Sequence, residues 1–111
     1  MRVGCLGAVA AVALMAAPAY AQSAAEKGAK VFTDQKCSMC HSVAGKGNPK
    51  GPLDEAANTL TGDDIRQWLV NPEAMREKTH AERKPAMKSF ATLSKDDQDA
   101  LIAYVLSLKK K

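Results

Sequence analysis

The sequence is poor in the residues that usually build or cross-link a small core. Aromatic residues make up 5% of its 111 residues, and it has three cysteines. A chain this small buries proportionately little apolar surface, and exported domains of similar size often compensate with disulfides. Cys5 lies in the leader described below, which leaves only Cys37 and Cys40. Because these two belong to one short motif, something other than a disulfide framework must complete the core.

The sequence also lacks strand-like alternation, internal repeats, low-complexity tracts and a linker. Apolar residues instead recur at helical spacing, which predicts helices at about 24–35, after Thr61, from Pro72 and after Ser94. The stretch 42–60 is dense in glycine and proline, which indicates a wrapped loop. We therefore expect a single all-α domain.

The first predicted helix contains an unusual glycine. Glycine is costly inside a helix unless another backbone must approach closely, so Gly28 predicts a tight helix crossing with Phe32 beside it. Ser23 and Glu26 have the form of a capping box at the start of this helix.

The chain opens with the pattern of a leader. Arg2 precedes an apolar run over residues 3–17, and an Ala-x-Ala sequence ends at Ala21. This order is typical of a secretory signal peptide. The alternative is a membrane anchor, but the run is too short to span comfortably and no stop-transfer residues follow. We expect residues 1–21 to be removed on export and residues 22–111 to form the mature domain, which would then not be an integral membrane protein.

The pentapeptide Cys37-Ser-Met-Cys40-His41 carries the strongest chemical signal in the chain. Two cysteines three residues apart, followed at once by histidine, form the attachment pattern of a c-type haem. On a helical turn, residues i and i+3 project from one face, so both thiols can reach neighbouring vinyl groups of one porphyrin. His41 can then bind the iron as its proximal ligand. The motif predicts one haem c per chain, bound covalently through Cys37 and Cys40.

Two other chemistries use similar motifs. A structural zinc site needs four ligands, and beyond Cys37, Cys40 and His41 only His80 is an obvious candidate. A thiol–disulfide redox pair normally lies on a βαβ scaffold, which this chain lacks. Export, the helical frame and a late methionine agree better with haem.

Residues 24–109 resemble the class I cytochromes c, small proteins with one haem. The haem motif comes near the start, and Lys84-Pro-Ala-Met87 comes late. The resemblance implies an all-α cytochrome c fold, in which the N- and C-terminal helices cross and helices and loops wrap around one covalent haem. In that family the first helix carries a glycine followed four residues later by an aromatic, as Gly28 and Phe32 do here, and Tyr104 stands at the aromatic position of the last helix.

The resemblance also implies two residues of the haem pocket. Gly51-Pro52-Leu53 would pass beside the proximal histidine, with the Pro52 carbonyl accepting a hydrogen bond from the second imidazole nitrogen. Such a bond fixes the ring and raises its basicity. Trp68 resembles the tryptophan or other donor that reaches a haem propionate.

The second axial ligand must come from later in the chain. Met39 lies inside the attachment turn, which leaves Met75 and Met87 among the methionines after the leader. Met75 falls on a predicted helix, where methionine is more often core filler. Met87 lies in a loop whose sequence resembles the ligand loop of the family, and it is therefore the predicted distal ligand. Met75 and His80 stay as alternatives, although His80 lies among charged residues typical of a solvated surface.

Function follows from the ligand pair. An iron bound by His41 and Met87 has no open coordination position, and this pair raises the reduction potential. The sequence therefore predicts a soluble, monomeric, periplasmic electron carrier that is not an enzyme. Two alternatives remain: a gas-binding or peroxidase-like haem protein with an open distal site, and a dedicated haem subunit of a larger oxidoreductase.

The formal net charge of +4 at pH 7 is modest. It does not suggest nucleic acid as a partner, but it agrees with a basic face that docks an acidic redox protein. For any single lysine, an ordinary solvated position is the simpler interpretation. The lysines that flank the segments expected around the haem edge are Lys30, Lys36, Lys46, Lys50, Lys84 and Lys88.

Overall fold

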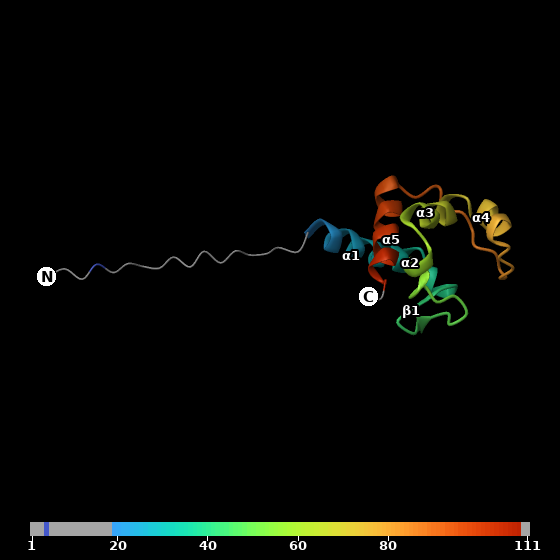
Figure 1. The fold of residues 1–111 in the computed structure, drawn as a ribbon, viewed down its shortest axis with the longest axis horizontal. Coiled ribbons are helices and arrows are strands. Elements are labelled where there is room, and N and C mark those ends of the chain that lie inside the picture. The colour runs from blue at the N-terminus through green and yellow to red at the C-terminus, as the bar shows by residue number, and fades with distance from the viewer. Residues whose placement is uncertain (1–3, 5–18, 110–111) are drawn as a thin grey trace.

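The computed structural model describes Gly4 and residues 19–109. The predicted signal peptide, residues 1–21, lies outside this part of the chain except for Gly4 and positions 19–21. The elements are α1 (Ala19–Asp34), the 3₁₀ turn η1 (Cys37–Met39), β1 (Ser42–Val43), β2 (Lys46–Gly47), α2 (Ala56–Thr59), α3 (Gly62–Val70), α4 (Pro72–Thr79) and α5 (Lys95–Ser107). Figure 1 shows α5 crossing α1, with α3 and α4 at the upper right and β1 below α2. The predicted all-α fold is confirmed.

The crossing of α1 and α5 depends on Gly28. A Cβ placed on Gly28 would lie 2.6 Å from the Tyr104 Cβ and 2.7 Å from the Ala100 carbonyl carbon, and closer still to the Ala100 oxygen. One helical turn further along α1, the rings of Phe32 and Tyr104 are in contact. Their centroids are 5.5 Å apart and their planes are inclined at 59°, which is a favourable aromatic arrangement. The tight crossing predicted from Gly28 and Phe32 is confirmed.

The core lies where α1, α3 and α5 meet. Its buried side chains come from each of these three helices, and partly buried residues of the connecting loops pack against them. The residues of the core cluster are Val31, Phe32, Ile65, Leu69, Leu101, Ile102 and Val105. With a single aromatic ring in this cluster, the core is small, as the composition predicted.

Polar caps fix where three of the helices begin. Thr61 and Asp64 form a reciprocal capping box, with the Thr61 N–H donating to the Asp64 carboxylate at 2.9 Å. The Asn71 side chain, just before Pro72, accepts from the Ala74 N–H, and the Ser94 hydroxyl accepts from the Asp97 N–H in the first turn of α5. These starts agree with the sequence, because each cap satisfies a helical N–H that has no partner within its helix.

Two local expectations are wrong. The helix α1 begins at Ala19 rather than Ala24, so Ser23 lies inside it and does not cap its start. The stretch 42–60 is not only loop, because β1 and β2 pair antiparallel with Ser42 opposite Gly47, and α2 follows. The turn between them places Ala44 and Gly45 at φ 51° and 79°, the left-handed conformation that tight hairpins require. Strands of two residues are too short to show alternation in sequence.

Candidate functional site

The haem motif begins where α1 ends. Lys36 adopts the left-handed conformation (φ 57°), which stops the helix and starts the turn η1. Within this turn the amides of Cys40 and His41 both donate to the Cys37 carbonyl, at 3.1 and 2.8 Å. The Cys37 thiol is half-buried, the Cys40 thiol is exposed, and both are free. Burial raises the pKa of the Cys37 thiol, which favours its protonated form.

His41 is held by the backbone of the next loop. Its Nδ1 lies 3.1 Å from the Gly51 carbonyl oxygen, which accepts only if Nδ1 carries the proton, and this leaves Nε2 as the free lone pair. The same carbonyl accepts from the Ser42 N–H at 3.0 Å. The acceptor predicted from the resemblance was the Pro52 carbonyl; the structure places the bond one residue earlier, because Ser42 pairs with this segment and sets its register.

The environment of His41 favours the neutral imidazole. Burial lowers its pKa most, the positive charge of Arg83 lowers it further, and the hydrogen bond to Gly51 acts in the opposite direction. A neutral ring with a fixed tautomer is the form in which histidine binds a metal. His41 is thus oriented to offer Nε2 as a ligand.

Met87 lies in the loop between α4 and α5, residues 80–94, here called the Met87 loop. The Phe90 N–H donates to the Leu69 carbonyl at 2.6 Å, and the Ser89 hydroxyl donates to the Val70 carbonyl at 3.2 Å. These bonds tie the segment after Met87 to the last turn of α3. The Met87 side chain is partly buried and packs against the same core cluster as Cys37. The structure therefore packs one attachment cysteine and the predicted distal ligand against one core cluster.

The two alternative distal ligands occupy different settings. Met75 is 6% exposed on α4, which agrees with a packing role for this side chain. His80 is exposed and caps the C-terminus of α4 in the left-handed conformation (φ 58°).

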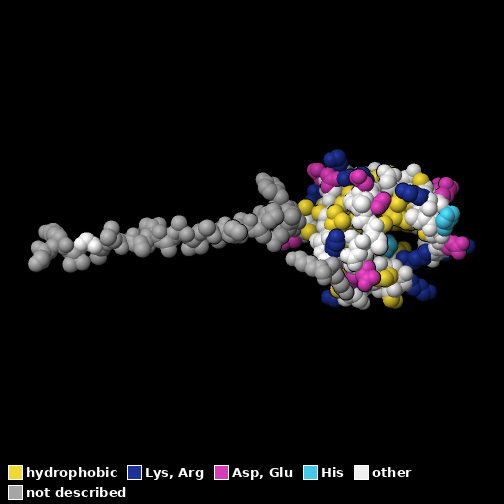
Figure 2. All heavy atoms as spheres, in the orientation of Figure 1, with side chains coloured by type: hydrophobic (Ala, Val, Ile, Leu, Met, Phe, Trp, Pro, Cys, Tyr) yellow, Lys and Arg dark blue, Asp and Glu magenta, His cyan; other side chains and the backbone are white. Residues whose placement is uncertain are grey.

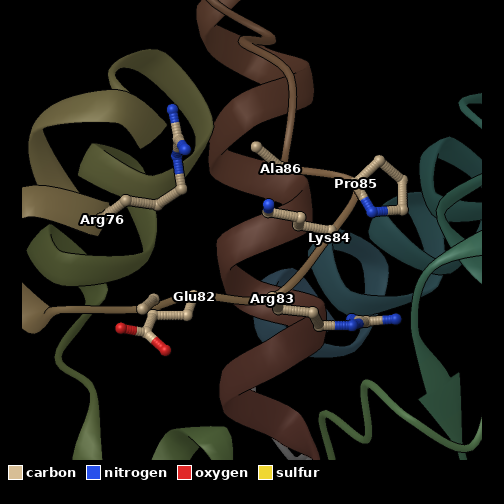
Figure 3. Close-up of a pocket in the computed structure, with 7 residues that line it drawn as sticks. Arg76, Glu82, Arg83, Lys84, Pro85 and Ala86 are labelled. Atoms are coloured by element: carbon tan, nitrogen blue, oxygen red, sulfur yellow. The ribbon is translucent and has the colours of Figure 1, made fainter.

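Two cavities lie beside the Met87 loop. The larger, of about 670 Å³, is drawn in Figure 3 and is lined by Arg76, Ala81, Glu82, Arg83, Lys84, Pro85 and Ala86. The smaller, of about 230 Å³, is lined by Val70, Asn71, Pro72, Glu73, Arg76, Met87 and Ser89. Figure 2 shows a hollow on this side of the molecule, with lysine, arginine and histidine side chains at its rim. The larger volume is in the range of small-molecule and cofactor sites.

Arg76 links the two cavities. It lines both of them, and its Nε is buried and has no hydrogen-bond partner among the described residues. Such a donor is costly to leave unpaired, and a guanidinium pairs best with a carboxylate. Together with Arg83 and Lys84, it gives the larger cavity a cationic lining.

These residues fit a c-type haem. Two thiols in one turn, a neutral imidazole with a free Nε2 and a thioether are the donor set that such a cofactor uses. The unpaired Arg76 donor suits the propionates, which are the anionic groups of the porphyrin. In the described part of the chain, no group of three or more His, Cys, Asp or Glu side chains gathers in metal-binding geometry, so the zinc alternative finds no ligand set there.

Trp68 is half-buried on α3, and its contribution to a haem pocket stays a prediction. Pro52 is exposed and forms the bridge to Ser42. Sequence reasoning placed Gly51 beside His41 but did not identify it as the acceptor, and it did not single out Arg76 or Arg83. Only the density of charge between 76 and 84 could have indicated these two arginines.

Fold and site together define a small c-type haem protein. The family model for cytochrome c matches residues 25–109, and the chain belongs to the cytochrome c family. The chain is also similar to a cytochrome c oxidase subunit 2 from Alkalihalophilus pseudofirmus, with 29% identity over 97 residues. That match covers 79% of this chain but 27% of the relative, so the chain spans about a quarter of that protein's length. No solved structure matches.

Family membership bears directly on the cofactor. Cytochromes c carry haem c, typically bound covalently, and use it in electron transfer. Among the helices of the described residues, none combines the length and the apolar composition needed to cross a membrane.

Proposed function

We propose that this chain is a soluble periplasmic electron carrier with one haem c, attached through Cys37 and Cys40 and ligated by His41 and Met87. The observation that carries the proposal is the placement of the ligands. His41 is fixed through Nδ1 with Nε2 free, and Met87 packs on the same core as Cys37. Membership of the cytochrome c family supports the electron-transfer role.

The chain's own residues keep the site in one arrangement. The Gly51 carbonyl fixes the orientation of the His41 ring, and the bonds from Ser89 and Phe90 to α3 hold the Met87 loop. When bound, the haem supplies an iron that exchanges one electron between the ferrous and ferric states. Ligands that did not move between these states would limit the rearrangement that each transfer requires, and an iron held by both His41 and Met87 would have no open position for a substrate. For this reason we propose a carrier and not an enzyme.

A basic face is the proposed docking surface for an acidic redox partner. The six lysines named above are all exposed, on or just after α1 and the β ribbon and in the Met87 loop. Lys30 pairs with Asp34 at 3.3 Å, and the Lys88 ammonium lies 5.3 Å from the centroid of the Phe90 ring. As a group, these charges can orient a partner at long range. We propose that the carrier is a monomer that meets its partners transiently.

A second candidate is a haem subunit or domain of a larger oxidoreductase. It is favoured by one observation, the similarity to a cytochrome c oxidase subunit 2. Purification of the native protein under mild conditions discriminates the two. A tight complex of fixed stoichiometry would favour the subunit, and a free protein of monomer size would favour the carrier.

Optical spectra of the haem-loaded protein test the ligand assignment. Oxidised wild type is expected to show the methionine-to-iron charge-transfer band. Met87→Ala is expected to remove this band and to allow the reduced protein to bind carbon monoxide, because it opens the distal position. Met75→Ala is the matched control and is expected to keep the band. The reverse pattern would reassign the ligand to Met75, and a wild type that lacks the band and binds carbon monoxide would favour an open-site haem protein.

A further inference from the structure

Arg83 reaches from the Met87 loop to the loop that orients His41. Figure 3 shows that Arg83 and the adjacent Lys84 leave the backbone in opposite directions, with Arg83 pointing away from Arg76. A Cβ placed on Gly51 would lie 2.9 Å from the Arg83 Cζ and closer to its Nη1. The guanidinium therefore rests directly on the Gly51 backbone, in space that any side chain at position 51 would fill.

The contact with Gly51 is important because the Gly51 carbonyl orients the proximal ligand. This carbonyl is the acceptor for the Nδ1 of His41, at 3.1 Å, and for the Ser42 N–H, at 3.0 Å. Arg83 thus contacts the residue whose carbonyl orients the proximal ligand, although it belongs to the loop that carries Met87. In the described part of the chain, the ion pairs involve other residues and no carboxylate pairs with Arg83, so its charge is not neutralised by a neighbour.

We propose that Arg83 is a positioning residue of the redox site: it docks the Met87 loop onto Gly51 and places a positive charge beside the proximal ligand. The inference rests on the proposed His41 and Met87 ligation. A positive charge near the iron disfavours the ferric form, which carries one more positive charge than the ferrous form. Arg83 therefore raises the reduction potential in addition to the effect of the axial ligands.

Three variants of the haem-loaded protein test this. Arg83→Gln removes the charge and the planar group, Arg83→Lys keeps the charge, and Lys84→Gln removes a charge from the next residue, which points the other way. The measurement is the midpoint potential by redox titration at low salt. Arg83→Gln is expected to shift the ferrous-to-ferric ratio at fixed solution potential about fivefold toward ferric, or about 40 mV for a one-electron couple. Arg83→Lys and Lys84→Gln are expected to give less than half of that shift.

A second readout follows the docking without using the iron. The Ser42 amide donates to Gly51, so its hydrogen exchange is expected to become severalfold faster in Arg83→Gln and to be unchanged in Lys84→Gln. An unchanged exchange rate in Arg83→Gln would overturn the docking role.

Other outcomes would overturn the charge effect. Equal shifts in Arg83→Gln and Lys84→Gln would mean that any cation nearby acts alike, and equal shifts in Arg83→Gln and Arg83→Lys would mean that charge is not the cause. The charge-transfer band separates this inference from the proposed function. Its presence in wild type with no effect of Arg83→Gln overturns the inference alone, whereas its absence in wild type overturns both.

Discussion

Replacement of Gly28 by alanine tests whether the close approach of α1 and α5 at this residue is required for the stability of the domain. The new Cβ would lie 2.6 Å from the Tyr104 Cβ and 2.7 Å from the Ala100 carbonyl carbon. Both distances are well inside van der Waals contact, and part of the obstacle is helix backbone, which cannot rotate aside as a side chain can. The two helices must therefore move apart.

The size of the effect is the difference between two opposing terms. Alanine is favoured over glycine inside a helix by about 1 kcal/mol, while overpacking a close contact costs about 1–3 kcal/mol, and more where backbone must shift. We expect the upper end of that range at Gly28, so the net loss is about 2 kcal/mol of the free energy of unfolding. For a domain of this size such a loss lowers the melting temperature by about 8–16 °C.

Gly62→Ala is the matched control, because Gly62 also lies in a helix. A Cβ at that position would meet the Ile102 Cγ2 at 3.5 Å and the Leu106 Cδ1 at 3.8 Å, which are ordinary contacts. Its stability should stay within about 0.5 kcal/mol of wild type or exceed it. The assay is thermal and urea unfolding of the haem-loaded proteins, followed by far-UV circular dichroism. Equal stability of Gly28→Ala and Gly62→Ala would refute the argument that the crossing is sterically closed.

Two more predictions concern α3 and α4. Met75→Ala should lose about 2–5 kcal/mol in urea unfolding, because Met75 is 6% exposed and its removal leaves a cavity; a small loss would show that the neighbours collapse into the space. Asp64→Ala should destabilise the protein at neutral pH but not in acid, since the Thr61 N–H holds the pKa of Asp64 below its ordinary value of 3.8. Its contribution is present above pH 3.8 and disappears as the pH falls through the lowered pKa of the folded state. Urea unfolding at pH 7 and at about pH 2 measures this, and a difference from wild type that is the same at both would contradict it.

The sequence predicted the features that arise from local chemistry. Thr61, Asn71 and Ser94 begin helices because each side chain can satisfy a free backbone N–H, and this depends only on the next three or four residues. Gly28 predicted a long-range contact for a different reason: its cost inside a helix requires a compensating close approach. The haem motif was equally local, since both cysteines and His41 lie within five residues.

The parts that the sequence did not predict depend on register and on distant pairing. The acceptor for His41 is Gly51 rather than Pro52 because the bridge between Ser42 and Pro52 sets where that loop passes. Arg83 on Gly51 joins residues far apart in the chain, and a run of surface charges gives no indication of which one contacts a distant loop. The start of α1 at Ala19 was missed because Ser23 and Glu26 satisfy the cap pattern in sequence, but a cap forms only where the preceding residues are not helical.

The two bonds that tie Ser89 and Phe90 to the end of α3 have a consequence for the evolution of this loop. The chain leaves α3 at Val70 and returns to Leu69 and Val70, so α4 and the residues after it form an excursion that is closed at its base. Loop-closure entropy changes slowly with length. Insertions or deletions at 80–82, between α4 and Arg83, should therefore cost little stability and leave the position of Met87 unchanged. Within the described residues, this excursion is a place where variation in length can alter the outer surface while Met87 stays packed on the core.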